Sequence, residues 1–132
     1  QYIRRRLADV VWRTLYFDAF LLLQIRLGAA MIYFKKYDTE SGQLVAICDE
    51  ELIGKKFKEG NIRLDLDTYA SFYKGELIKE ESAEALIDRD ALYSANVVGK
   101  RAVSVLLKKG IADKKDVKEI EGVPFVQIFT LD

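Results

Sequence analysis

The sequence predicts a single small α+β domain with a mainly antiparallel sheet and two helices, preceded by an N-terminal helical extension. Three observations support this fold class. Paired β-type runs flanking turn residues occur near both ends of residues 31–132, and a strictly alternating run lies between them. Helical periodicity is concentrated in residues 82–109. Strands that neighbour one another in sequence favour antiparallel pairing.

The first predicted element is a β-hairpin. Residues 31–36 and 44–48 are short β-type runs, and Asp38-Thr39-Glu40-Ser41-Gly42 between them is rich in turn-forming residues. Residues 49–57 are expected to form a short helical turn. Cys48, at the end of the second run, is expected to be a packed thiol rather than a nucleophile, because the chain has no histidine to activate it.

Two further strand signals follow. Residues 62–67, Ile-Arg-Leu-Asp-Leu-Asp, alternate between apolar and charged side chains, which predicts a strand with one buried and one exposed face. Residues 117–120 and 125–131 flank Glu121-Gly122-Val123-Pro124 and predict a closing hairpin.

The two helices are predicted over residues 82–92 and 96–109. Ser82 can cap the first, and Asn96 is the candidate cap of the second. Gly110 follows the second helix as a C-terminal signal. The apolar stripe of the second helix consists of Val98, Ala102, Val105 and Leu106.

The composition excludes several kinds of chemistry. The chain has 132 residues with no histidine and one cysteine, so it has no Ser-His-Asp or Cys-His triad, no His-ligated metal site and no internal disulfide. Paired acids on a charged segment are more typical of a solvated face than of an acid–base pair. We therefore expect no catalytic residue, no metal and no cofactor, although an enzymatic role stays open.

The net charge of zero combines two dissimilar pieces. Residues 1–30 hold five arginines and two aspartates, or +3, whereas residues 31–132 hold 16 basic and 19 acidic residues, or −3. The sole methionine is Met31, at the boundary. We interpret residues 1–30 as an N-terminal extension before a natural start at Met31, either an upstream read-through or the remnant of a longer chain. A genuine N-terminal helix is the alternative. The longest uncharged run that begins there, Leu27 to Phe34, has 8 residues, against about 18–20 for a membrane span. We therefore expect a cytoplasmic protein without a membrane segment.

A basic segment suggests an anionic partner. Between Gly99 and Lys118 there are seven bases and two acids, or +5. Basic side chains of the predicted second helix fall within about 100° of one another, opposite its apolar stripe. A focused basic face is what contact with phosphates requires. The candidate RNA-binding residues are Lys100, Arg101, Lys108, Lys114 and Lys115, and Lys55, Lys56 and Lys58 form a second cluster.

Three other interpretations stay open. The lysines can belong to an ordinary charged surface, as in proteins adapted to heat. Residues 76–90 hold six acids and two bases and can form an acidic helix that serves as a protein–protein adaptor. Asp49, Tyr73 and Asn96 can line the pocket of a small-molecule binder or enzyme.

Five stretches resemble a known family. They are Cys48-Asp49-Glu50-Glu51-Leu52-Ile53-Gly54-Lys55, Phe57-Lys58-Glu59-Gly60, Phe72-Tyr73-Lys74-Gly75, Ala95-Asn96-Val97-Val98-Gly99 and Ile120-Glu121-Gly122-Val123-Pro124. In this order they resemble the archaeal family called domain of unknown function 424, over residues 31–132 only. The positions that carry the resemblance are Asp49, Gly54, Gly60, Tyr73, Gly75, Asn96, Gly99, Gly122 and Pro124.

The resemblance implies an association rather than a mechanism. The family has no established activity, and its members resemble genes linked to translation. Phe125 stands where the family pattern often has histidine, which weakens the case for catalysis. We expect a non-enzymatic protein associated with RNA or the ribosome, without DNA specificity; its oligomeric state stays open. The glycines are expected to mark turns or close backbone approaches.

Overall fold

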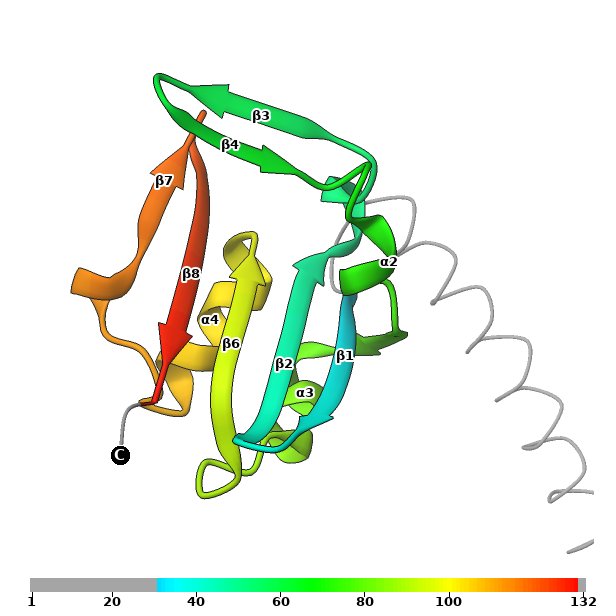
Figure 1. The fold of residues 1–132 in the computed structure, drawn as a ribbon, viewed down its shortest axis with the longest axis vertical. Helices are drawn as coiled ribbons and strands as arrows, with labels where there is room; N and C mark the ends of the chain where they lie inside the picture. The colour runs from blue at the N-terminus through cyan, green and yellow to red at the C-terminus, as the bar shows by residue number, and fades with distance from the viewer. Residues whose placement is uncertain (1–30, 131–132) are drawn as a thin grey trace, which may run out of the picture. The chain divides into compact units, whose positions relative to one another are not determined.

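The main sheet of the protein has six strands in the order β5-β1-β2-β6-β8-β7, and a separate two-stranded sheet pairs β3 with β4 (Figure 1). The computed structural model describes residues 31–130, so the helical extension expected over residues 1–30 lies outside the described residues. The strands are β1 Met31–Thr39, β2 Gly42–Asp49, β3 Lys56–Glu59, β4 Ile62–Asp65, β5 Glu76–Lys79, β6 Leu92–Val98, β7 Lys118–Ile120 and β8 Val123–Phe129.

The sheet is mainly antiparallel, as the sequence predicts. Of the described strand pairs, only β2 and β6 run parallel, with Cys48 opposite Val98. This parallel pair lies at the centre of the sheet and joins two antiparallel halves, β5-β1-β2 and β6-β8-β7.

The described residues contain three α-helices and two 3-10 helices. The α-helices are α2 Ala70–Tyr73, α3 Glu80–Leu86 and α4 Lys100–Lys108, and the 3-10 helices are η1 Glu50–Leu52 and η2 Lys114–Asp116. Helices α3 and α4 lie together behind the sheet in Figure 1, whereas the β3–β4 hairpin crosses its upper end.

Each face of the sheet has its own core, because successive side chains of a strand point to opposite faces. On one face, strand residues such as Ile47 and Val97 pack with Ala83 of α3 and Leu106 of α4. On the other, Cys48 and its neighbours pack with residues of α2 and the β3–β4 hairpin. That second cluster contains Ala46, Leu66, Tyr73 and Val98, with Phe57, Leu64 and Phe72 against it.

The structure confirms both predicted hairpins, although Val123 and Pro124 belong to β8 rather than to the second turn. The helical turn expected over residues 49–57 is limited to Glu50–Leu52, and the strand expected over residues 62–67 ends at Asp65. The structure also corrects the helices. The first runs only from Glu80 to Leu86, and a helix not expected from the sequence, α2, precedes it. The acidic segment 76–90 is therefore not one helix, since it begins with strand β5.

The largest error is at residues 92–98, where Asn96 is a strand residue rather than a helix cap. Strand β6 lies between β2 and β8, and Ser94, Ala95, Val97 and Val98 are buried. A strand covered on both faces does not alternate between polar and apolar residues, so its pattern does not distinguish it from a buried helix. Helix α4 begins only after Gly99, which has a φ of 109°.

Candidate functional site

Three stretches that resemble the family meet at one end of the central parallel pair. Asp49 ends β2, and Gly99 directly follows β6. Because parallel strands present their carboxyl ends at the same edge of a sheet, Asp49 and Gly99 become neighbours. The backbone N–H of Gly99 donates to the carbonyl oxygen of Pro124 at 2.8 Å, which brings in the third stretch.

Asp49 caps helix α4 from a distant strand. Its side chain is buried, with 3% of the residue exposed, and its carboxylate accepts the backbone N–H groups of Arg101 at 3.3 Å and Ala102 at 2.8 Å. The first N–H groups of a helix have no partner within the helix, so this carboxylate satisfies two of them. Burial raises the pKa of Asp49, and the two backbone hydrogen bonds act in the opposite direction by stabilising the charged form.

Gly99 makes room for that carboxylate. A Cβ atom added at this position would overlap the Asp49 carboxylate, and the φ of 109° disfavours any residue with a side chain. Glycine at this position is therefore required by the contact between strand β2 and helix α4.

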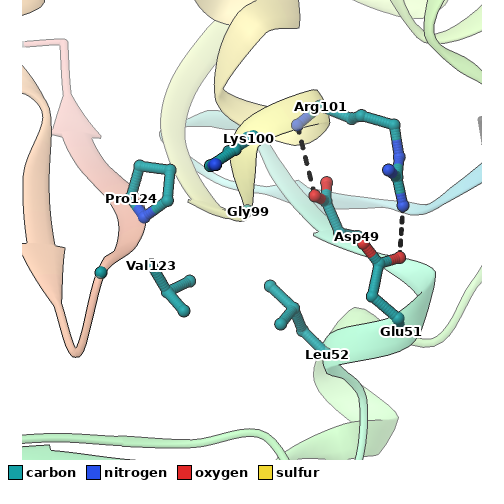
Figure 2. Close-up of a pocket in the computed structure, with 9 residues that line it drawn as sticks. Asp49, Glu51, Leu52, Gly99, Lys100, Arg101, Val123 and Pro124 are labelled. Atoms are coloured by element: carbon teal, nitrogen blue, oxygen red, sulfur yellow. Dashed lines mark hydrogen bonds and ion pairs between the residues drawn. The ribbon is translucent and has the colours of Figure 1, made fainter. Parts of the chain in front are cut away.

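A pocket of about 250 Å³ opens beside this contact. In Figure 2 the labelled side chains come from the end of β2 and η1, the start of α4, and the start of β8. Arg101 forms an ion pair with Glu51, and the two lie on the side of the pocket away from Val123 and Pro124 (Figure 2). The pocket is lined by Asp49, Glu51, Leu52, Gly99, Lys100, Arg101, Gly122, Val123 and Pro124.

The chemistry of this pocket is limited. Asp49 already accepts two hydrogen bonds from the start of α4, so that helix end offers a bound anion fewer free N–H groups. The charge of Arg101 is compensated by Glu51, which leaves Lys100 as the exposed cation at the pocket. No group of three or more His, Cys, Asp or Glu side chains suited to a metal occurs in the described part of the chain.

Two further side chains that could take part in chemistry, Cys48 and Tyr73, are buried in the second core. Burial raises the pKa of the Cys48 thiol to about 12, so it is not a thiolate at neutral pH. Burial likewise raises the pKa of Tyr73 to about 12. The pocket that Asp49 lines is lined by neither Tyr73 nor Asn96, so the three residues do not form the shared pocket considered above.

The five candidate RNA-binding residues have different surroundings. Lys100 is exposed at the first position of α4, and Lys114 and Lys115 are exposed in η2. Arg101 is half-buried against Glu51, and Lys108 lies 3.5 Å from the carboxylate of Glu80 on α3. Helical periodicity predicted that Arg101 and Lys108 share one helix face. It could not predict that each forms an ion pair with an acid from a distant segment.

The acidic and basic segments also contact each other elsewhere. The ammonium group of Lys109 donates to the carbonyl oxygens of Glu84 and Ile87 at the end of α3. Lys108 is also 4.0 Å from the carboxylate of Glu84. Some of the charged side chains that suggested an external partner for the acidic and the basic segment therefore contact each other between α3 and α4.

The remaining glycines of the resemblance have the expected backbone roles. Gly75 approaches β1 so closely that a Cβ would overlap the carbonyl oxygen of Phe34. Positive φ angles are found at Gly54, Gly60 and Gly122.

Fold and site together define a small α+β domain whose pocket is built by the family-like stretches. The profile of the family described as "Protein of unknown function (DUF424)" matches residues 37–131, and the chain belongs to this family.

A similar solved structure is the crystal structure of an uncharacterized conserved protein from the archaeon Methanopyrus kandleri. It matches with a TM-score of 0.66 and 28% identity, covering 76% of this chain and 91% of that chain. No curated protein matches the chain. No helix of the described residues is long and apolar enough to cross a membrane.

Proposed function

We propose that the protein is a non-enzymatic, cytoplasmic RNA- or ribosome-associated protein that acts in translation and contacts phosphates through Lys100, Lys114 and Lys115. The observation that carries the proposal is the charge left in the segment from Gly99 to Lys118. Its +5 is reduced only to +3 by the ion pairs of Arg101 with Glu51 and of Lys108 with Glu80. A localised positive charge of this kind attracts the phosphate backbone of nucleic acids.

The three lysines can reach a ligand. All three are exposed, and no ion pair within residues 31–130 involves them. Next to Lys114 and Lys115, Asp113 and Asp116 are engaged in a capping box at η2, where their carboxylates accept backbone N–H groups. These two carboxylates are therefore bonded to the backbone of η2 rather than paired with the lysine side chains.

The two alternative functions have weaker support. An adaptor that uses the acidic segment needs free carboxylates, but Glu80 and Glu84 already face Lys108. A small-molecule binder or enzyme needs polar groups in the pocket that are free to contact a ligand, and the Asp49 carboxylate there already accepts two N–H groups from the start of α4.

The proposal is tested by measuring the binding of a short single-stranded RNA and of ribosomes as a function of salt concentration. The triple variant Lys100→Glu, Lys114→Glu, Lys115→Glu is expected to bind RNA at least about tenfold more weakly at low salt and to show a shallower salt dependence. In a plot of the logarithm of the binding constant against the logarithm of the salt concentration, three phosphate contacts with a single strand contribute about −2 to the slope.

A matched control has the same change in charge elsewhere. Lys36, Lys74 and Lys79 are exposed and lie outside the basic segment, so reversing these three should leave most of the affinity intact. Absence of wild-type binding at low salt, or an equal loss in both triple variants, would contradict the proposal.

A further inference from the structure

The β3–β4 hairpin carries opposed positive charges on its outer face. Lys58 of β3 lies directly opposite Arg63 of β4. The alternating residues Phe57 and Leu64 pack against the second core, so Lys58 and Arg63 both point away from it. Both are exposed, and like charges directly opposite one another destabilise a strand pair.

The acids nearest this pair are bonded to other groups. The carboxylate of Asp65 accepts the backbone N–H groups of Asp67 at 3.0 Å and Thr68 at 2.9 Å, and hydrogen bonds from Thr68 lower the pKa of Asp65. Lys56, on the same outer face, is 4.0 Å from the carboxylate of Asp67. Within residues 31–130, no ion pair involves Lys58 or Arg63.

Two hydrogen bonds connect the hairpin to the rest of the domain. The backbone N–H of Lys58 donates to the carboxylate of Glu121 at 2.9 Å, and the backbone N–H of Glu121 donates to Glu59 at 3.3 Å. Glu121 thus holds β3 against the turn between β7 and β8 by using its carboxylate on the backbone. A hollow of about 260 Å³ on the hairpin is lined by Lys56, Phe57, Lys58, Arg63, Leu64 and Asp65.

From these contacts we infer that the outer face of the β3–β4 hairpin binds nucleic-acid phosphates, with one phosphate seated between Lys58 and Arg63. A phosphodiester there, with its single negative charge, offsets half of the positive charge of the pair and weakens their repulsion, and the guanidinium fork of Arg63 matches its oxygens. The inference rests on the proposed function only in that both require a nucleic-acid partner. Lys58 and Arg63 themselves lie outside the segment from Gly99 to Lys118 that carries the proposed function.

The test compares the full-length double variant Lys58→Glu, Arg63→Glu with Lys36→Glu, Lys74→Glu, which has the same change in charge. The probes are a short single-stranded RNA and an RNA duplex, each with and without polyglutamate as a competitor. The hairpin variant is expected to bind at least about tenfold more weakly, and the control less than about threefold. Thermal unfolding checks that each variant folds, and Lys58→Gln, Arg63→Gln replaces the hairpin variant if it does not.

Each outcome separates this inference from the proposed function. RNA binding that is lost on reversing Lys100, Lys114 and Lys115 but unchanged in the hairpin variant would overturn the hairpin site alone. Absence of RNA binding in the wild type would overturn both. Displacement by polyglutamate as effective as by unlabelled RNA would overturn the nucleic-acid assignment in favour of an acidic protein segment.

Discussion

The two ends of helix α4 are both stabilised by charged groups, but in different environments. At the N-terminal end, the buried carboxylate of Asp49 accepts two backbone N–H groups. At the other end, Lys108 pairs with Glu80 across the surface while its side chain remains 59% exposed. Both arrangements suit the helix dipole. The contribution of such a contact to the stability of the helix therefore depends on its burial and on its hydrogen-bond geometry, and not on charge alone.

The largest expected effect comes from filling the space beside Asp49. Gly99→Ala should destabilise the protein by more than about 3 kcal/mol, because the added Cβ meets a buried carboxylate and the φ of 109° is unfavourable for alanine. Denaturant unfolding measures this change. Combining Gly99→Ala with Asp49→Ala should cost less than the sum of the two single changes, since the second removes the overlap. Simple additivity would show that the two residues are not in contact.

The next effect tests the cap itself. Asp49→Ala should reduce the free energy of unfolding by about 2 kcal/mol, because it leaves the N–H groups of Arg101 and Ala102 without an acceptor. Asp49→Asn is the matched control and should cost less, since its amide oxygen can accept one of the two bonds. Equal losses in both variants would mean that the negative charge, not the hydrogen bonding, is what matters.

The smallest effect is expected at the opposite end. Lys108→Gln should change the free energy of unfolding by no more than about 0.5 kcal/mol, because an exposed ion pair is screened by water. A loss comparable with that of Asp49→Ala, measured in the same unfolding assay, would remove the distinction between the two ends.

The parts of the fold that depend on local chemistry could be predicted from the sequence. The turn-rich residues 38–42 determine the first hairpin, and the alternation from Ile62 determines β4. Strand β6 could not be predicted, since a central strand buried on both faces lacks alternation and its Asn96 resembled a helix cap. The four-residue strand β3 could not be predicted for another reason: three of its residues are charged and only Phe57 is apolar, which is too short a pattern to indicate a strand.

The candidate site depends on contacts between distant segments. Asp49 and Gly99 were each singled out by the resemblance, but their contact requires the parallel pairing of β2 with β6. The pairing of Arg101 with Glu51 and of Lys108 with Glu80 is equally non-local. Helical periodicity identifies which side chains share a face, but it does not reveal which acids from other elements compensate them.

The central parallel pair also has a consequence for how the chain folds. The connection from β2 to β6 runs through residues 50–91 and includes β3, β4, α2, β5 and α3. The hairpins form between neighbouring residues, whereas the pairings of β1 with β5 and of β2 with β6 both join strands that are distant in the sequence. Contacts of such sequence separation slow folding, so the rate-limiting step is expected to be the formation of these two pairings. The pairing of β2 with β6 also assembles the pocket, because it brings Asp49 to the start of α4.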